Sequence, residues 1–159
     1  MRAIVQRVSS AEVRVGGRTI GKIGPGFAVL LGVTHGDDEA DADYIADRIA
    51  GMRVFADAAG KMNLALAAAG GAVLAISQFT LYADPGQRRP SFAAAAAPEP
   101  ARRLYECFVS RLRARDVSVE TGEFGAHMEL ALVNDGPVTI ILDSRERRQA
   151  ARPNSSEIR

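Results

Sequence analysis

The sequence lacks the features of secreted and membrane-bound proteins. Its 159 residues include one cysteine, Cys107, so no internal disulfide can form and a reducing compartment is expected. No apolar run approaches the ~18 residues of a membrane span. Near the N-terminus, Arg2 and Arg7 stand where a signal peptide would be apolar. We therefore expect a cytoplasmic protein with no membrane partner.

Side chains that commonly carry catalysis or bind metals are also scarce. The two histidines, His35 and His127, have no partners at metal-ligand spacing, so we expect neither a metal nor another cofactor. There is no Gly-x-Ser-x-Gly elbow and no glycine-rich phosphate loop. Cys107 follows Leu104 by one helical turn, which favours a core thiol over a nucleophile. A hydrolase that depends on an ordinary set of catalytic side chains is hard to assemble from this sequence.

An excess of charge of one sign is missing as well. The 20 basic and 19 acidic residues give a net charge of +1. Residues 145–159 hold five Arg and two Glu, or +3, which leaves −2 for residues 1–144. A domain so near neutrality is not a general binder of nucleic acid, so any RNA contact must be local. We expect residues 1–144 to form one domain and residues 145–159 a basic, disordered tail.

What the sequence does contain is a series of short apolar segments separated by turn residues, the pattern of β-strands. Two longer amphipathic segments predict helices, one from Asp38 to about Arg53 and one from Pro98 to about Arg115. We predict a single α+β domain, mostly antiparallel, that combines a barrel-like sheet of short strands with two helices. The predicted strands are residues 1–8, 11–15, 19–23, 27–33, 72–81, 117–121, 128–133 and 138–142.

Two polar segments stand out from this background. Residues 77–81, Ser-Gln-Phe-Thr-Leu, place polar side chains at the end of an apolar strand, where they must find partners or face a cleft. Residues 134–139, Asn-Asp-Gly-Pro-Val-Thr, are also compatible with a plain turn between two strands. Each segment alone leaves an ordinary structural role open.

Together the two segments resemble the paired motifs of the D-aminoacyl-tRNA deacylase family. The resemblance runs from residue 1 to about residue 143. It includes residues 4–8 (Ile-Val-Gln-Arg-Val), 60–63 (Gly-Lys-Met-Asn) and 89–92 (Arg-Pro-Ser-Phe). It implies hydrolysis of the ester that joins a D-amino acid, or glycine, to the 3′-terminal adenosine of tRNA. It also implies a homodimer whose site lies at the subunit interface and rejects L-aminoacyl-tRNA.

The resemblance assigns roles to particular residues. The catalytic strand consists of Ser77, Gln78, Phe79 and Thr80. A Gly136–Pro137 dipeptide with a cis bond enters from the partner subunit and excludes L side chains with its backbone. Arg7 holds this dipeptide, with Met128 packing nearby. Phe92 and the pair Arg88 and Arg89 are candidates for the terminal adenosine and its phosphates.

The resemblance also explains the missing catalytic side chains. An aminoacyl ester is already activated, so positioning and an oxyanion donor can supply much of the acceleration. The backbone N–H groups near Phe79 and Thr80 are our candidates for that donor, with the ribose 2′-OH helping to activate water. Thr80 as nucleophile is the rival reading, although it has no visible base. Two other functions stay open: a non-catalytic RNA-binding, translation-associated module, and a small-ester hydrolase that uses Thr80.

Overall fold

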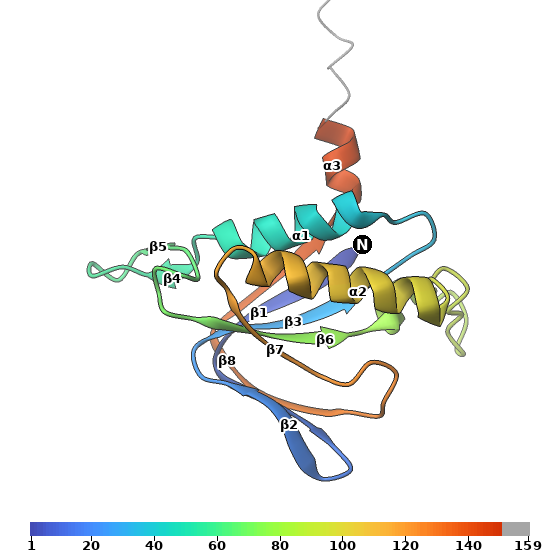
Figure 1. Cartoon of the computed structure of the whole chain (residues 1–159), viewed down its shortest axis with the longest axis horizontal. Coiled ribbons are helices and arrows are strands. Elements are labelled where there is room, and N and C mark those ends of the chain that lie inside the picture. The colour runs from blue at the N-terminus through green and yellow to red at the C-terminus, as the bar shows by residue number, and fades with distance from the viewer. Residues whose placement is uncertain (151–159) are drawn as a thin grey trace, which may run out of the picture.

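A computed structural model of the chain describes residues 1–150 (Figure 1). Its strands and helices follow in the order β1 (Arg2–Val15), β2 (Arg18–Ile23), β3 (Gly26–Gly32), α1 (Glu39–Gly51), β4 (Phe55–Ala56), β5 (Met62–Leu64), β6 (Ala72–Ser77), the 3₁₀ turn η1 (Phe79–Tyr82), α2 (Pro98–Arg113), β7 (Ser118–Thr121), β8 (Glu129–Asp143) and α3 (Arg145–Ala150). The predicted α+β class is confirmed, and both main helices lie where they were predicted.

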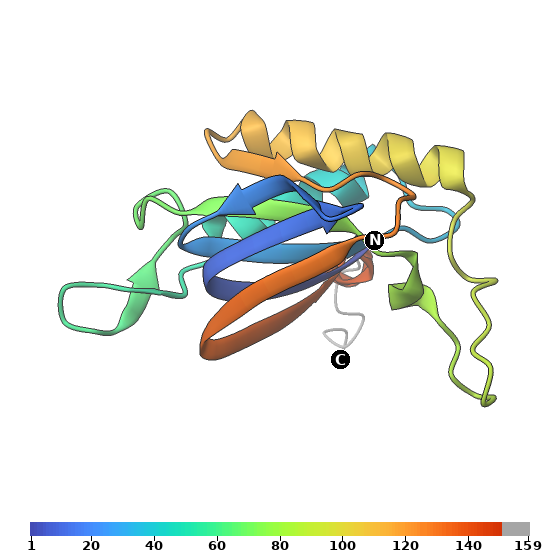
Figure 2. The same ribbon diagram turned by 90° about the horizontal axis from the view of Figure 1, so that it is seen from below.

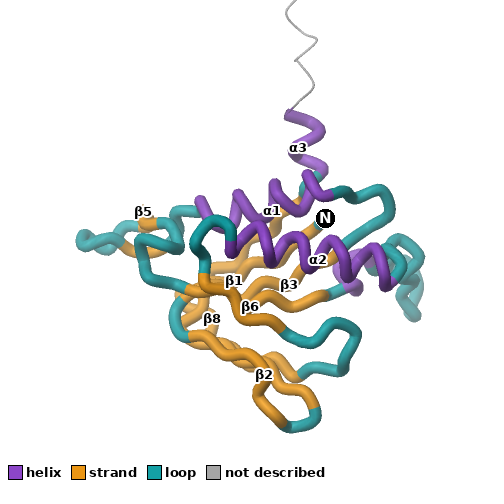
Figure 3. Tube along the Cα trace, viewed as in Figure 1, coloured by secondary structure: helices purple, strands orange, loops and turns teal. Residues whose placement is uncertain are grey.

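The main sheet is mixed, in the order β2-β1-β3-β6-β7, and β8 also pairs with β1. The first half of β1 pairs with β3 and its second half with β2, whereas β8 pairs along nearly the whole of β1, at its opposite edge. The β1 strand pairs antiparallel with β2, β3 and β8, whereas β3–β6 and β6–β7 are parallel. The two parallel connections contain α1 and α2, and these helices lie side by side against one face of the sheet (Figures 1 and 3). The sheet curls into an incomplete barrel, and Figure 2 shows the curvature of β1 and β8.

Two apolar cores form on the two faces of this sheet. The larger core fills the space between the sheet and the helices, where Phe27 and Phe108 are fully buried together with the apolar stripe of α1. The smaller core lies inside the curl and includes Val13 and Leu74. Cys107 packs half-buried against the larger core. Burial of these side chains, at about 25 cal/mol per Å² of apolar surface, is the main stabilising contribution to the fold.

Local sequence signals explain the helix boundaries. The Asp38 carboxylate accepts the N–H of Asp41, and the Asp41 carboxylate accepts the N–H of Asp38, both at 3.0 Å. This reciprocal cap satisfies backbone donors that the first turn of α1 leaves unpaired. Pro98 opens α2 in the position where a missing N–H costs nothing.

Several strand predictions were wrong in their boundaries. The segments 1–8 and 11–15 form one strand, β1, and the segments 128–133 and 138–142 form one strand, β8. These two strands pair along most of their length, and shifts of register near Val8 absorb the extra residues at 135–138. The expected turn at 134–137 is therefore a bulged part of β8. The short strands β4 and β5, which pair with each other, are not among the predicted strands.

The first residues after the expected domain boundary at residue 144 are helical. The chain continues directly into α3, which the prediction of a disordered tail from residue 145 did not include. Arg147 of α3 lies 3.2 Å from the carboxylate of Asp41 and 3.6 Å from that of Asp38, so ion pairs hold α3 to the start of α1. The rest of the predicted tail, residues 151–159, lies outside the described residues.

No helix among residues 1–150 is long and apolar enough to cross a membrane.

Candidate functional site

A cavity of about 600 Å³ opens where β3 and β6 end beneath α2. Five residues predicted for the site line it: Ser77, Gln78, Phe79, Phe92 and Met128. Its other walls come from α2 and from the loop that precedes β8. The cavity thus gathers residues from four separate parts of the chain.

The first polar motif, residues 77–81, lies at this cavity because β6 ends at Ser77 and the chain turns just beyond it. The N–H of Gln78 donates to the carbonyl of Leu31 of β3 at 2.8 Å. The chain then crosses Gly32, where a Cβ would lie 3.0 Å from the Gln78 carbonyl oxygen and 3.0 Å from the Leu81 Cβ. Residues 79–82 therefore form the turn η1, and the prediction of a strand through residue 81 was wrong from residue 78 onward.

The turn η1 exposes two backbone donors. The N–H groups of Phe79 and Thr80 are the first of a 3₁₀ turn, so they have no partner within it. Among residues 1–150 neither group has a hydrogen-bond acceptor, and the side chain of Gln78 does not cap the turn. Two adjacent unpaired N–H groups beside a cavity can hold a developing oxyanion.

The hydroxyl of Thr80 has a weaker case as a nucleophile. It accepts a hydrogen bond from Gln78 Nε2 at 2.5 Å. Within the described part of the chain no imidazole or carboxylate contacts this hydroxyl, and Thr80 is absent from the cavity lining. A threonine hydroxyl without a base is a poor nucleophile.

Two aromatic side chains that line the cavity are partly exposed, and two basic residues lie on the loop that precedes Phe92. Phe79 and Phe92 are 56% and 41% exposed, and their rings meet edge to face. Between them in the sequence, Asp84 and Ser91 exchange backbone hydrogen bonds at 2.8 and 3.0 Å and close a loop that exposes Arg88 and Arg89 (loop residues 84–91).

Sequence reasoning missed other cavity residues. His127 lines the cavity and is exposed, but nothing in the sequence marked it as a site residue. Tyr105 comes from the buried stripe of α2, and its hydroxyl donates to the carbonyl of Ala75 at 2.8 Å. Burial raises the pKa of Tyr105 to about 12, so the hydroxyl stays protonated at neutral pH. An apolar stripe gives no signal that one of its members also faces a cavity.

The second motif lies elsewhere, in the bulged part of β8. The Gly136–Pro137 bond is cis, as predicted. Asn134 spans this dipeptide: its Oδ1 accepts the N–H of Val138 and its Nδ2 donates to Thr139 Oγ1, both at 3.0 Å. These bonds explain the spacing of Asn and Thr on either side of Gly-Pro.

Arg7 braces the same dipeptide from β1. Its Nε donates to the carbonyl of Asp135 at 3.0 Å, and its Nη1 makes a short hydrogen bond to the carbonyl of Val54. The guanidinium is thus fixed between the bulge and the segment before β4. Gly136 and Pro137 themselves are exposed.

The two motifs do not meet within one subunit. Ser77 pairs with Leu31, which pairs with Ala3 of β1, whereas the Gly-Pro bulge lies beside Arg7. Four residues along a strand correspond to about 13 Å, and the three strand spacings from β6 to β8 to about 14 Å. Met128 likewise lies with the cavity and not with the bulge. The predicted site therefore falls into two separate halves in this chain.

No group of three or more His, Cys, Asp or Glu side chains within residues 1–150 could hold a metal ion.

The class defined by this fold and site is a single α+β domain with a half-closed mixed barrel, a cavity rimmed by backbone donors and a braced Gly-cisPro bulge. Comparison with known proteins shows which family within this class the chain belongs to. Residues 4–143 match the family described as D-Tyr-tRNA(Tyr) deacylase, and the chain belongs to this family.

Individual relatives agree with this assignment. The D-aminoacyl-tRNA deacylase of Symbiobacterium thermophilum is 61% identical over 147 residues, which cover 92% of this chain and 97% of that protein. The enzyme of the same name from Thermus aquaticus is 57% identical over 148 residues, with the same coverage.

Two solved structures share the fold. One, described as c-Myc DNA Unwinding Element Binding Protein, matches with a TM-score of 0.84 and 37% identity over 90% of this chain and 98% of that one. A probable eukaryotic D-amino acid tRNA deacylase matches with a TM-score of 0.76 over 89% of this chain and 97% of that one. Its identity is 15%, so it shows the fold alone.

Proposed function

We propose that this protein hydrolyses D-aminoacyl-tRNA at a site shared by two subunits. Its membership of the family and its close relatives make it a D-aminoacyl-tRNA deacylase, an ester hydrolase that removes D-amino acids from mischarged tRNA. In the shared site, the cavity comes from one subunit and the Gly136–Pro137 bulge from its partner.

The observation that carries the two-subunit site is the separation of the two motifs. A braced, exposed Gly-Pro bulge has no task in its own subunit, because the cavity lies several strands away. A two-fold axis would bring the bulge of each subunit to the cavity of the other with one self-complementary contact. Homodimerisation therefore completes both sites at once.

The exposed edge of β8 supports this dimer. Within the described residues β8 pairs with β1 alone, so its other edge is unpaired over a long strand. Val133 and Ile141 on this strand are 57% and 66% exposed. A long edge strand with exposed branched apolar side chains is the kind of surface that another chain covers.

The proposed chemistry rests on the backbone. Water attacks the ester carbonyl, and the N–H groups of Phe79 and Thr80 hold the oxyanion that forms. Collapse of this intermediate breaks the bond to the ribose 3′ oxygen, which takes a proton and leaves as the hydroxyl. The neighbouring ribose 2′-OH helps to activate the water, so the protein needs no side-chain base.

The same geometry accounts for selectivity. The carbonyls of Gly136 and Pro137 face the Cα and the amino group of the substrate from the partner subunit. A rigid backbone wall clashes with an L side chain but leaves a D side chain directed toward solvent. Because rejection needs no pocket for a particular side chain, many D-residues and also glycine are accepted.

The rim holds the end of the RNA. Phe79 and Phe92 offer aromatic faces to the terminal adenine, since stacking of this kind is tolerant of sequence. Arg88 and Arg89 lie exposed on the adjoining loop, where they can contact phosphates. If only the end of the tRNA is bound, the rest of the protein surface needs no basic patch for RNA. This agrees with the net charge of +1.

Mixing two inactive variants tests the shared site. Ala126→Trp fills the cavity from a half-buried loop position, and Gly136→Ala alters the bulge. In a mixed dimer, one site combines both defects and the other has neither. After subunit exchange at equal amounts, about a quarter of the sites should be intact, because half of the dimers are mixed. Rescue toward that level supports the proposal, and no rescue in verified mixed dimers contradicts it.

The substrate for this assay is one tRNA charged in parallel with D- and L-tyrosine. Release of D-tyrosine alone agrees with the proposed filter, whereas equal rates on both contradict it. A non-catalytic RNA-binding module would release neither amino acid. A small-ester hydrolase would cleave a model ester without RNA, which the proposed mechanism does not allow.

A further inference from the structure

The first residue of the chain is tied into the interior by its backbone. Met1 is fully buried. Its α-ammonium group donates to Asp37 Oδ1 at 2.7 Å and to Ser144 Oγ at 2.5 Å, and the N–H of Ser144 donates back to the Met1 carbonyl at 2.8 Å. The side chain of Asp37 is 5% exposed and Ser144 is 1% exposed. This is an ion pair almost without solvent.

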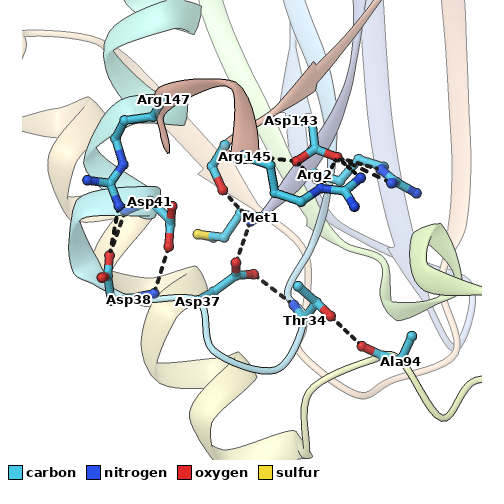
Figure 4. Close-up of polar contacts among 11 residues, drawn as sticks. Met1, Arg2, Thr34, Asp37, Asp38, Asp41, Ala94, Asp143, Arg145 and Arg147 are labelled. Atoms are coloured by element: carbon cyan, nitrogen blue, oxygen red, sulfur yellow. Dashed lines mark hydrogen bonds and ion pairs between the residues drawn. The ribbon is translucent and has the colours of Figure 1, made fainter. Parts of the chain in front are cut away.

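The ion pair continues through Asp37 toward the cavity (Figure 4). The second carboxylate oxygen of Asp37 accepts the N–H of Thr34 at 2.8 Å. The hydroxyl of Thr34 then donates to the carbonyl of Ala94 at 2.5 Å. An uninterrupted polar chain thus connects Met1 to the segment at residues 92–97.

This segment is one wall of the cavity. Phe92, Ala95 and Ala96 line it. The segment belongs to no helix or strand of the sheet. Four of its six residues are exposed, and five of the six are alanines. Besides the ring contact of Phe92 with Phe79 and the packing of Ala96 on the larger core, its attachment is polar. Ala95 bridges to Thr34, the N–H of Ala96 donates to Val33 at 3.0 Å, and His35 contacts the carbonyl of Ala93 at 3.0 Å. Each of these polar contacts ends on residues 33–35.

The position of residues 33–35 therefore fixes the wall, and Asp37 fixes that position. A buried carboxylate that loses its counter-ion must leave its site or take up a proton, because an unpaired charge in the interior is strongly unfavourable. The α-ammonium of Met1 is the cation at contact distance. Small apolar side chains in the wall cannot replace this attachment.

We propose that the ion pair between the Met1 α-ammonium and Asp37 positions the cavity wall at residues 92–97 through Thr34, and so sets the affinity for the aminoacylated end of tRNA. Asp37 and Thr34 are positioning residues that do not touch the substrate. The link to tRNA affinity rests on the function proposed above, whereas the link to the wall does not.

One consequence concerns the nitrogen itself. An acyl group or a further residue on the Met1 nitrogen would turn the ammonium into a neutral amide and add atoms at a fully buried position. The wall should then loosen even though no side chain has changed.

The test compares Thr34→Val and Asp37→Asn with matched variants at exposed positions, Thr19→Val in β2 and Asp47→Asn in α1. We expect Thr34→Val to raise KM for D-aminoacyl-tRNA about 3- to 10-fold with kcat nearly unchanged, as the loss of one hydrogen bond would do. Amide hydrogen exchange of residues 93–97 should accelerate at the same time, with Tm little changed. The control variants should move neither quantity.

A chain with one glycine added before Met1 tests the ammonium directly. It should show the raised KM and the faster exchange at residues 93–97 that Asp37→Asn shows. Unchanged KM and unchanged exchange in Thr34→Val would overturn the proposal. We expect Thr34→Val to fold even if the chain with the added glycine does not, so the test does not depend on the latter. Failure of the proposed function would give a different result. The unmodified protein would lack deacylase activity, but Thr34→Val would still accelerate the hydrogen exchange of residues 93–97.

Discussion

The rings of Phe79 and Phe92 meet edge to face with their centroids 5.1 Å apart at the mouth of the cavity. Although they contact each other, the two side chains are 56% and 41% exposed. Aromatic side chains that only pack in a core are more deeply buried than this. Their backbones belong to separate segments, η1 and the wall at residues 92–97. The pair therefore connects the two sides of the cavity mouth and offers a surface to an incoming base.

The first prediction follows from this pair. Phe92→Ala should raise KM for D-aminoacyl-tRNA by about 10-fold or more, since stacking of a base on an aromatic ring contributes roughly 1–3 kcal/mol. Stability should fall little because Phe92 is 41% exposed and so lies outside the buried core. Ile20→Ala, at a similarly exposed apolar position in β2, is the control. An unchanged KM for Phe92→Ala would show that this ring does not bind the RNA end.

The second prediction concerns Thr80. If the oxyanion is held by backbone N–H groups, Thr80→Ala should keep most of the activity, because those groups remain. Removal of a nucleophile would instead lower kcat by orders of magnitude. Single-turnover deacylation of D-tyrosyl-tRNA measures the difference. A loss of about 10⁴-fold in a folded dimer would assign the mechanism to the side chain.

The helices could be predicted from the sequence because their signals are local. Asp38 caps α1 and Pro98 opens α2, and each signal lies within one turn of the boundary that it sets. The long strands could not be predicted in the same way. Whether residues 1–8 and 11–15 form one strand depends on pairing with β8, more than a hundred residues away. Turn residues such as those at 134–137 then become a bulge.

The site shows the same division. The motif residues could be found, and Ser77, Gln78 and Phe79 do line the cavity. Their separation from Gly136 could not be deduced, because it is set by the register of four strands. The attachment of residues 92–97 to Asp37 through Thr34 could not be predicted either, since a run of alanines has no polar side chain that would indicate a partner.

The third prediction is a pH dependence of stability. Partial burial of Asp143 alone would raise its pKa, but hydrogen bonds from Arg145 and Arg2 outweigh burial and lower the pKa to about 2. The carboxylate therefore stabilises the folded state above its unfolded pKa of about 3.9, and this contribution disappears as the pH falls toward 2. Asp143→Asn should reduce the free energy of unfolding by about 1 kcal/mol at pH 7, allowing for screening of the exposed Arg145.

Chemical denaturation at a series of pH values measures this effect. The difference between Asp143→Asn and the unmodified protein should be constant above about pH 5 and shrink toward zero near pH 2. Asp47→Asn, at a position where the side chain is 71% exposed, should show no such trend. A difference for Asp143→Asn that stays constant down to pH 2 would contradict the assignment.

The fourth prediction concerns the edge of β8. Ile141→Lys places a charge on the apolar surface proposed as the dimer interface, where Ile141 is 66% exposed in the isolated subunit. We expect the protein to become monomeric and to lose deacylase activity, while its stability as a subunit changes little. Sedimentation measures the state of association, and Ile20→Lys in β2 is the control. A dimer that persists with full activity would place the interface elsewhere.

The last prediction concerns Gly136, which has φ of +130°. A Cβ at this position would lie 2.8 Å from Val138 Cγ2 and 2.9 Å from Arg7 Nη2. Arg7 cannot yield freely, because its guanidinium is bonded to the carbonyls of Asp135 and Val54. Gly136→Ala must therefore shift the bulge as well as strain its backbone, at a cost of about 1–3 kcal/mol.

A displaced bulge would misalign the carbonyls that face the substrate in the partner's cavity. A shift of about 1 Å can lower a rate by about 100-fold, so we expect Gly136→Ala to lose D-tyrosyl-tRNA hydrolysis to about that extent. We also expect its remaining activity to discriminate less against L-tyrosine. Gly17→Ala is the matched control, because Gly17 has φ of +78° but no atom within 4 Å of an added Cβ. It carries the backbone strain without the clash, far from the bulge. If both variants lose stability and only Gly136→Ala changes the ratio of D to L hydrolysis, the bulge is the chiral filter. If neither changes that ratio, selectivity lies in another part of the site.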